Sequence, residues 1–139
     1  MKVAIDSSAL TKRYVLEVGS DQLNAYLQQA SQLGVSIILV PEIISAMNRR
    51  LREAALSAAD YRIVKRQMLN DIRDCTVLQI TPAVVAHSLH LLEQNTLRAM
   101  DALHVACALA WRADLFITAD RRQLAAAENA GMQAAFIGA

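Results

Sequence analysis

Three acidic residues each follow an apolar run typical of a buried β-strand. They are Asp6 after residues 2–5, Glu42 after residues 36–40, and Asp120 after residues 115–118. A fourth acid, Asp101, stands near the start of the apolar stretch "MDALHVACALAW". Functional sites of open α/β sheets lie outside the carboxyl ends of the strands. We therefore expect the first three acids at one rim of a sheet, joined by Asp101 if its helix begins there.

Carboxylates gathered at one rim repel one another, which raises their pKa values. A divalent cation removes that conflict, and ligands that are all oxygen suit Mg²⁺ or Mn²⁺ rather than zinc. The two cysteines, Cys75 and Cys107, have no zinc-type spacing with the histidines. The pattern therefore favours a magnesium or manganese site.

Each acid also has an interpretation that needs no metal. Asp6 and Asp120 suit the caps of helices, and Glu42 suits the first turn of a helix, where the helix dipole favours negative charge. His104, one turn beyond Asp101, is interpreted as a structural residue or as its buried partner. Asp101 is the hardest acid to explain in these ways because its immediate neighbours are apolar. It is best explained as an acid of a metal site.

Short strand-like runs alternate with longer helical patterns along the chain. The runs typical of strands are residues 2–5, 36–40, 76–80, 115–118 and 134–138. The helical patterns cover residues 20–33, 42–55, 58–73, 82–95, 98–112 and 120–130. This alternation predicts βα units around a central, mainly parallel sheet. We expect a single α/β domain of three layers, α/β/α, over residues 1–139.

The composition limits the oligomeric state, the cellular compartment and the membrane contacts that we expect. The chain has 139 residues, of which 55% are apolar, and a formal net charge of +1. Because the apolar share exceeds the roughly 45–50% of ordinary soluble domains, we expect a generous core or an oligomer. The N-terminal segment reaches Asp6 too soon for a signal sequence, and charges interrupt every long apolar run. We therefore expect a cytoplasmic protein with no membrane contact.

Half of the basic residues fall in two neighbouring helical patterns, 42–55 and 58–73. They are Arg49, Arg50, Arg52, Arg62, Lys65, Arg66 and Arg73, against Glu53, Asp60 and Asp71 in the same interval. Such a face is either simply solvated or in contact with phosphates, which adds affinity without sequence preference. The sequence leaves both interpretations open.

Three segments together resemble PIN-domain ribonucleases, and most of all the VapC-type toxins of bacterial toxin–antitoxin pairs. They are "AIDSSALTKRYVLEVGS", "VPEIISAMNRRLREAALS" and "LRAMDALHVACALAWRADLFITADRRQLAAAENAGM". The third segment is the most specific, since it combines an acid, an apolar helix and a T-x-D sequence after a strand. Because each motif alone is short, their order and spacing carry the resemblance.

The resemblance implies a PIN-like fold and a Mg²⁺- or Mn²⁺-dependent endoribonuclease acting on structured RNA, such as tRNA or ribosomal RNA. It also implies a homodimer and a VapB-type antitoxin whose C-terminal segment covers the site. The family's acidic positions match Asp6, Glu42, Asp101 and Asp120. Thr118 matches a hydroxyl residue that supports the site, and Ser7 is expected to donate to the same site.

With this resemblance we expect Asp6, Asp101 and Asp120 to hold most of the cation. The cation would lower the pKa of the attacking water, and Glu42 would ligate through water or orient that water. Three pairs of basic residues are candidates for contacts with the RNA backbone. They are Lys12 and Arg13, Arg49 and Arg50, and Arg121 and Arg122.

Two other functions stay open at this point. A PIN-like fold with little hydrolytic activity would serve as a binding module for nucleic acid or protein. A nuclease of this fold without an antitoxin would serve in housekeeping RNA processing. Replacement of Asp101 with Asn separates enzyme from binding module, because only the enzyme would lose cleavage and metal affinity.

Overall fold

The computed structural model describes residues 1–138, and its centre is one parallel sheet of five strands in the order β3-β2-β1-β4-β5. The strands are β1 (Lys2–Ile5), β2 (Gln32–Ser36), β3 (Thr76–Leu78), β4 (Leu115–Thr118) and β5 (Ala134–Phe136). The chain adds β2 and β3 on one side of β1, then crosses to add β4 and β5 on the other. The strand order thus reverses at β1, and binding crevices of such sheets open at that reversal.

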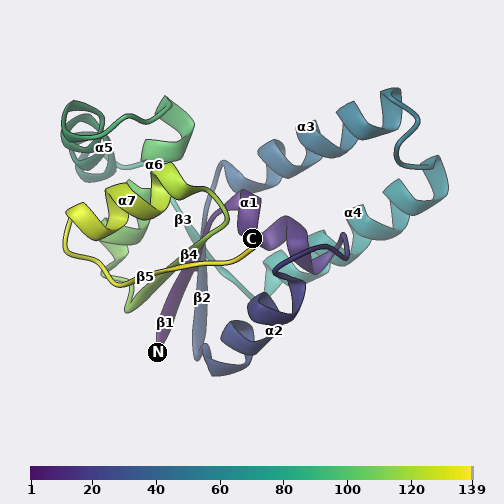
Figure 1. Cartoon of the computed structure of the whole chain (residues 1–139), viewed down its shortest axis with the longest axis horizontal. Helices are drawn as coiled ribbons and strands as arrows, with labels where there is room; N and C mark the ends of the chain where they lie inside the picture. Colours follow the sequence, from purple (N-terminus) through teal and green to yellow (C-terminus); the bar gives the residue numbers. More distant parts are fainter. Residues whose placement is uncertain (139) are drawn as a thin grey trace.

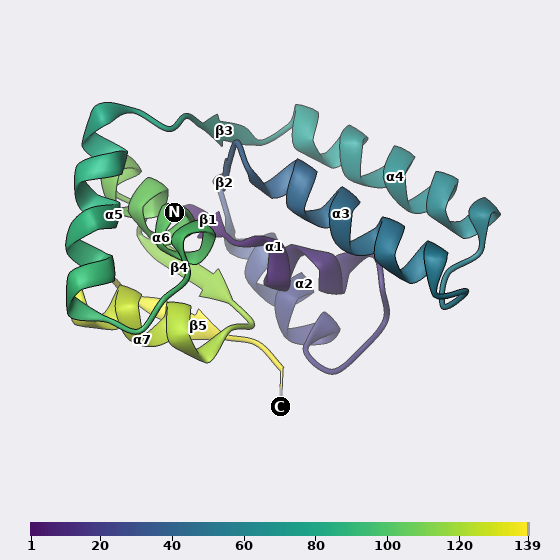
Figure 2. The same cartoon turned by 90° about the horizontal axis from the view of Figure 1, so that it is seen from above.

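Helices cover both faces of the sheet, so the predicted three-layer α/β fold is confirmed. One face carries α1 (Ser7–Leu10), the 3-10 turn η1 (Thr11–Arg13), α2 (Ser20–Gln29), α3 (Leu39–Arg52) and α4 (Ala58–Arg73). The other face carries α5 (Pro82–Gln94), α6 (Ala99–Trp111) and α7 (Arg121–Asn129). Figure 1 shows these two layers on either side of the strands, and Figure 2 shows the same separation from above.

Alternating strand residues divide the core between the two layers. Val3 and Ile5 of β1 pack toward α1–α4, whereas Ala4 packs toward α5–α7, as the alternation of side chains along a strand requires. α6 lies against the sheet with small buried side chains such as Ala102 and Ala106. Its apolar character all round follows from this central place.

The predicted strand 36–40 is wrong. β2 ends at Ser36, and α3 begins at Leu39. Pro41 lies in the first turn of α3, where a backbone N–H would have no partner within the helix, so proline is tolerated there. The strand instead includes Gly34, which a propensity argument disfavours. A side chain at Gly34 would meet the ring of Trp111, because a built Cβ lies 2.5 Å from that ring.

Other differences concern the ends of elements. The predicted helix 20–33 ends at Gln29, since its last residues belong to the turn and to β2. The short helix α1 and the turn η1 were not predicted, because a few residues are too short for an apolar period. Among the described residues, no helix combines the length and apolar character needed to cross a membrane.

The helices α3 and α4 form a hairpin that extends away from the sheet (Figure 1; Figure 2). We call residues 39–73 the α3–α4 hairpin. Ser57 caps α4 by accepting a hydrogen bond from the backbone N–H of Asp60. Asn48 Nδ2 donates to the Tyr61 hydroxyl at 3.0 Å and so joins the two helices. The hairpin therefore has its own polar contact in addition to its apolar packing.

Candidate active site

An open cleft of about 700 Å³ lies where α3, α6 and α7 begin. Three predicted acids and three arginines line it: Glu42, Asp101, Asp120, Arg98, Arg121 and Arg122. The fourth acid, Asp6, does not line the cleft, because it is fully buried after β1. The structure thus brings three of the four predicted acids to one cleft and places the fourth beneath the surface.

Asp6 is held by hydrogen bonds in place of water. Its Oδ1 accepts from the backbone N–H of Ala9, which caps α1, and its Oδ2 accepts from Thr118 Oγ1, both at 2.9 Å. Ser8 Oγ contacts both carboxylate oxygens. Burial raises the pKa of Asp6 above its ordinary value, although His104 and these hydrogen bonds act in the opposite direction. The structure therefore shows Asp6 capping a helix, as one interpretation of the sequence suggested.

Thr118 connects Asp6 to Asp120. Its hydroxyl donates to Asp6 and accepts from the backbone N–H of Asp120 at 3.0 Å. Asp120 also caps α7, since its Oδ1 accepts from the backbone N–H groups of Arg122 and Gln123. The same carboxylate thus serves the helix with one oxygen and lines the cleft.

Asp101 lies in the first turn of α6 and is held by Gln123. Gln123 Nε2 donates to Asp101 Oδ1 at 3.0 Å, and the Gln123 side chain is almost fully buried. Burial raises the pKa of Asp101, and the negative charge of Asp120 raises it further. Gln123 was missed in the sequence because a glutamine on an amphipathic helix has no distinctive motif. It contacts Asp101 with its side chain and Asp120 with its backbone.

Glu42 lies in the first turn of α3 and is held from two elements. Its Oε1 accepts hydrogen bonds from Ser7 Oγ at 3.0 Å and from His104 Nε2. Burial favours a higher pKa for Glu42, but the hydrogen bond and charge of His104, with the Ser7 hydroxyl, outweigh it and lower the pKa. Of the two interpretations of His104, the pairing with Asp101 is wrong, because the hydrogen bond of the ring is to Glu42. The ring reaches across to α3 instead.

Of the three predicted pairs of RNA contacts, one lines the cleft and another lies outside it. Arg121 and Arg122 line the cleft, and the Arg121 guanidinium stacks on Phe136 at 4.1 Å from the ring centre. Lys12 and Arg13 lie outside the cleft lining and are engaged elsewhere. Lys12 Nζ lies 3.3 Å from Glu17, and Arg13 Nε lies 2.8 Å from Asp71. Those two cations stabilise local structure.

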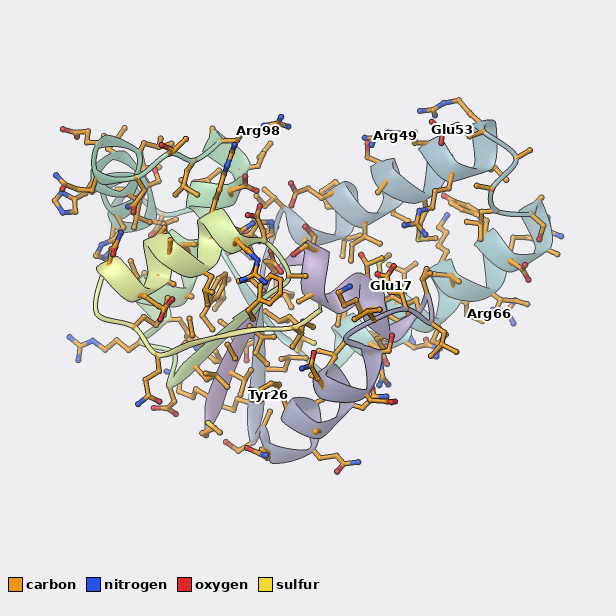
Figure 3. All side chains as sticks on the ribbon, viewed as in Figure 1. Glu17, Tyr26, Arg49, Glu53, Arg66 and Arg98 are labelled. Atoms are coloured by element: carbon orange, nitrogen blue, oxygen red, sulfur yellow. The ribbon has the colours of Figure 1, made fainter. Side chains whose placement is uncertain are left out.

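Two more arginines lie near the acids. Arg98, which lines the cleft, was missed, although it precedes Asp101 by one helical turn. Arg49 is exposed on α3, two turns beyond Glu42 and on the same helix face, whereas Arg50 is half-buried. Figure 3 shows Arg98 above the start of α6 and Arg49 above α3, with Arg66 on the outer side of α4.

The chemistry of the acids fits a hard divalent cation. All of the acid side chains offer oxygen, as Mg²⁺ and Mn²⁺ prefer. Within the described residues, the second carboxylate oxygens of Glu42, Asp101 and Asp120 accept no hydrogen bond. Across residues 1–138, no three Asp, Glu, His or Cys side chains already lie in position to share one ion. The donor types therefore fit, and like charge favours the separation of the carboxylates.

The model of the PIN domain family matches residues 3–129. The chain belongs to the PIN domain family. This PIN domain is 28% identical over 135 residues to Ribonuclease VapC45 of Mycobacterium tuberculosis, a match covering 96% of the chain and 94% of the relative. The resemblance to PIN-domain ribonucleases is therefore confirmed.

Two solved structures share the fold of this PIN domain. The crystal structure of VapBC2 from Rickettsia felis, bound to a DNA fragment from its promoter, matches with a TM-score of 0.70 at 13% identity, over 98% of each chain. Mycobacterium tuberculosis VapC20, described as a sarcin-ricin loop cleaving toxin, matches with a TM-score of 0.67 at 13% identity, over 89% of this chain and 94% of that one. PIN-domain ribonucleases in general depend on a metal ion.

Proposed function

We propose that this protein is a metal-dependent endoribonuclease that acts as the toxin of a VapBC-type pair. The observation that carries the proposal is one cleft in which three carboxylates, each with an oxygen free of hydrogen bonds from described residues, face arginine side chains. Carboxylates suit a metal that attacks phosphodiesters, and arginines suit the phosphates. VapC45 is a ribonuclease and VapC20 is a toxin that cleaves the sarcin-ricin loop, and both similarities support RNA as the substrate.

The proposed cation is Mg²⁺ or Mn²⁺, held by Asp6, Asp101 and Asp120. When bound, it supplies a water of lowered pKa and neutralises charge on the phosphate under attack. Asp101 and Asp120 line the cleft, and the charge of Asp120 helps to raise the pKa of Asp101, so a bound cation would relieve their repulsion. Asp6 belongs to the proposed set because Thr118 bonds to both Asp6 and Asp120.

Glu42 has a different proposed role, since its Oε1 is already held by Ser7 and His104. Its other oxygen would ligate the cation through a water molecule or orient the attacking water. The water oxygen bonds to phosphorus, the bond to the ribose 3′-oxygen breaks, and that oxygen takes up a proton. The products are a 5′-phosphate and a 3′-hydroxyl.

The proposed RNA path runs across the cleft from α6 to α3. Arg98 and Arg122 line the cleft itself. Arg49 lies about 10 Å from Glu42 along the axis of α3, given the rise of an α-helix. Contacts of this kind bind the backbone and add no sequence preference, so we assign the choice of target to RNA shape, as in tRNA or ribosomal RNA.

The proposed partners are a VapB-type antitoxin and a second copy of the chain. The structural neighbour from Rickettsia felis is a VapBC assembly, which supports the antitoxin. The apolar share of the sequence supports a homodimer, as do the exposed side chains of Val85 and Leu89 on α5. We place the proposed action in the cytoplasm because tRNA and ribosomal RNA reside there.

The experiment is cleavage of total bacterial RNA by purified, antitoxin-free protein. Parallel reactions contain Mg²⁺, Mn²⁺ or EDTA, and an Asp6→Asn variant serves as the control. We expect discrete fragments with either metal, and intact RNA with EDTA or with the variant. If folded wild-type protein leaves every RNA intact while still binding RNA, the chain is a binding module and the proposal is wrong.

A further inference from the structure

His104 is a buried ring that the proposed chemistry does not yet use. It is 3% exposed and lies three residues after Asp101 on α6, so both side chains project from neighbouring positions on one helix surface. A carboxylate only accepts hydrogen bonds, so His104 Nε2 carries the proton that it shares with Glu42. The α6 helix therefore supplies one cleft acid and a donor to another.

The ring is poorly explained as a simple core residue. Its Nδ1 is buried and has no hydrogen-bond partner among the described residues, and a buried polar atom without a partner is costly. An apolar side chain at this point of the apolar helix would avoid that cost. Among residues 1–138, the one hydrogen bond of the ring is to Glu42, and that contact suggests a role for His104.

The contact joins the two layers of the fold. α3 and α6 cover opposite faces of the sheet (Figure 1), and the hydrogen bond between Glu42 and His104 connects them beyond the ends of the strands. Ser7, which begins α1 directly after Asp6, donates to the same Oε1. Oε1 is therefore held from two directions, and only the other oxygen of Glu42 is left for the cleft.

We propose that His104 is the positioning residue for Glu42: it holds Oε1 so that the second oxygen stays directed into the cleft, toward the attacking water. The inference rests on the proposed function. A free glutamate side chain has several rotamers, and ordering it before the reaction removes an entropic cost from the catalytic step. Without His104, the carboxylate would be held only by the Ser7 hydroxyl, which can rotate. The imidazole ring, packed inside α6, is the rigid part of this support.

Two replacements of His104 separate the hydrogen bond from the packing. His104→Gln retains an amide N–H at a distance from the backbone similar to that of Nε2, so it should still donate to Glu42. His104→Leu fills the space with an apolar side chain and removes the donor. His87 on α5 is exposed and does not line the cleft, so His87→Leu is the control for a change of histidine to leucine away from the site.

The experiment measures cleavage kinetics and, without RNA, the affinity for Mn²⁺ by electron paramagnetic resonance. Both are measured for wild type, for His104→Leu, His104→Gln, Glu42→Gln and His87→Leu, and for the double variant His104→Leu/Glu42→Gln. We expect His104→Leu to lower kcat about 10–100-fold, the range found for residues that orient a metal site, with little change in KM. His104→Gln should stay within about threefold of wild type, and His87→Leu should equal it.

The double variant decides whether His104 acts through Glu42. Once Glu42 has become Gln, replacing His104 should lower kcat by less than about threefold, since the carboxylate to be positioned is gone. In the Mn²⁺ titration we expect His104→Leu and Glu42→Gln to weaken binding equally, by about three- to tenfold, and the double variant to be no weaker. Equal losses from His104→Leu in both backgrounds, or wild-type kcat and Mn²⁺ affinity, would overturn the inference.

Failure of the proposed function is recognised separately. If wild-type protein cleaves no RNA with metal, the endoribonuclease proposal fails, and the Mn²⁺ cycle still decides whether His104 acts on Glu42. If the wild type cleaves but His104→Gln is as impaired as His104→Leu, the ring serves packing rather than positioning. Thermal unfolding of each variant, measured in EDTA, identifies any loss that comes from unfolding.

Discussion

The cleft and the α3–α4 hairpin hold their charged side chains in opposite ways. In and beneath the cleft, three of the acids are fixed by a buried polar partner: Thr118 for Asp6, Gln123 for Asp101, and His104 for Glu42. In the hairpin, the basic residues from Arg49 to Arg73 make no ion pair with another described residue. On the proposed function, geometry is fixed where bonds would be cleaved, whereas charge alone is enough where an RNA backbone would be bound.

The comparison has an energetic side as well. Burial raises the pKa of Asp101, and the charge of the neighbouring Asp120 raises it further, so the second effect is an unfavourable repulsion between fixed carboxylates. The exposed arginines of the hairpin are solvated and cost little. We therefore expect substitutions in the cleft to change kcat and metal affinity, and substitutions in the hairpin to change KM and the dependence on salt.

The largest expected effect is the loss of one cleft carboxylate. Asp101→Asn keeps the shape of the side chain and its contact with Gln123 but removes the charge that the cation needs. We expect kcat to fall about 100-fold or more, with RNA affinity nearly unchanged. Multiple-turnover cleavage gives kcat, and filter binding in EDTA gives the affinity. A variant that cleaves normally would remove Asp101 from the site.

The pH dependence follows from the raised pKa values of Asp101 and Asp6. Both carboxylates must be ionised to hold a cation, so metal affinity and cleavage should fall as pH decreases, and the fall should begin above the ordinary aspartate pKa of 3.8. Below the pKa of one such acid the loss is about tenfold per pH unit. A Mn²⁺ titration at several pH values measures it, and Asp101→Asn should weaken the dependence.

In the metal-free protein, the contribution of these two acids to stability should depend on pH in the opposite direction to metal affinity. A raised pKa means that the folded state holds the proton more tightly than the unfolded state. The contributions of Asp6 and Asp101 to the free energy of unfolding should therefore decrease as pH rises through their raised values. Glu42, with a lowered pKa, stabilises the folded protein above its ordinary value of 4.5 and loses that effect at lower pH. Urea unfolding in EDTA across this range is the measurement.

A smaller effect is expected in the hairpin. Arg49→Ala should raise KM about three- to tenfold, leave kcat unchanged and reduce the salt dependence of RNA binding. Arg66→Ala is the matched control, because Arg66 lies on the outer side of α4 (Figure 3). Equal effects of the two variants would mean that the whole hairpin attracts RNA by charge without a defined path.

The smallest expected effect concerns the hairpin's own polar contact. Tyr61→Phe removes the hydroxyl that accepts from Asn48, which should lower the free energy of unfolding by about 1 kcal/mol. Cleavage under stable conditions should stay at the wild-type level. Chemical denaturation measures the first and the RNA assay the second. A loss of kcat in this variant would tie the hairpin to the catalytic geometry.

Much of the fold was predictable from local pattern. The alternation of strands and helices indicated the parallel sheet and the three layers, because each element has its own period. The prediction of a strand over residues 36–40 was wrong because a run of apolar residues does not distinguish a strand from the buried first turn of a helix. Gly34 lies in β2 at a point where the ring of Trp111 leaves no room for a side chain, and this neighbour is too far away in the sequence for a local pattern to reveal it.

The site was predictable in its acids but not in their partners. Acids that directly follow strands can be recognised in the sequence as site candidates, because the carboxyl ends of parallel strands meet at one edge of the sheet. His104 and Gln123 lie inside helices, where only the tertiary structure brings them to Glu42 and Asp101. Arg13 shows the converse, because its position suggested RNA and its contact is Asp71. The roles of the four acids stay predictions until they are tested.

The most direct test is to determine the chemical ends of the RNA fragments by sequencing methods that distinguish a 5′-phosphate from a 5′-hydroxyl. Hydrolysis by an external water leaves a 5′-phosphate and a 3′-hydroxyl. Attack by the RNA's own 2′-hydroxyl, which needs no metal, leaves a 2′,3′-cyclic phosphate and a 5′-hydroxyl. We predict 5′-phosphates at discrete sites, absent with EDTA and with Asp101→Asn. Cyclic phosphate ends, or the same cleavage sites with Asp101→Asn, would contradict a metal-dependent nuclease in this cleft.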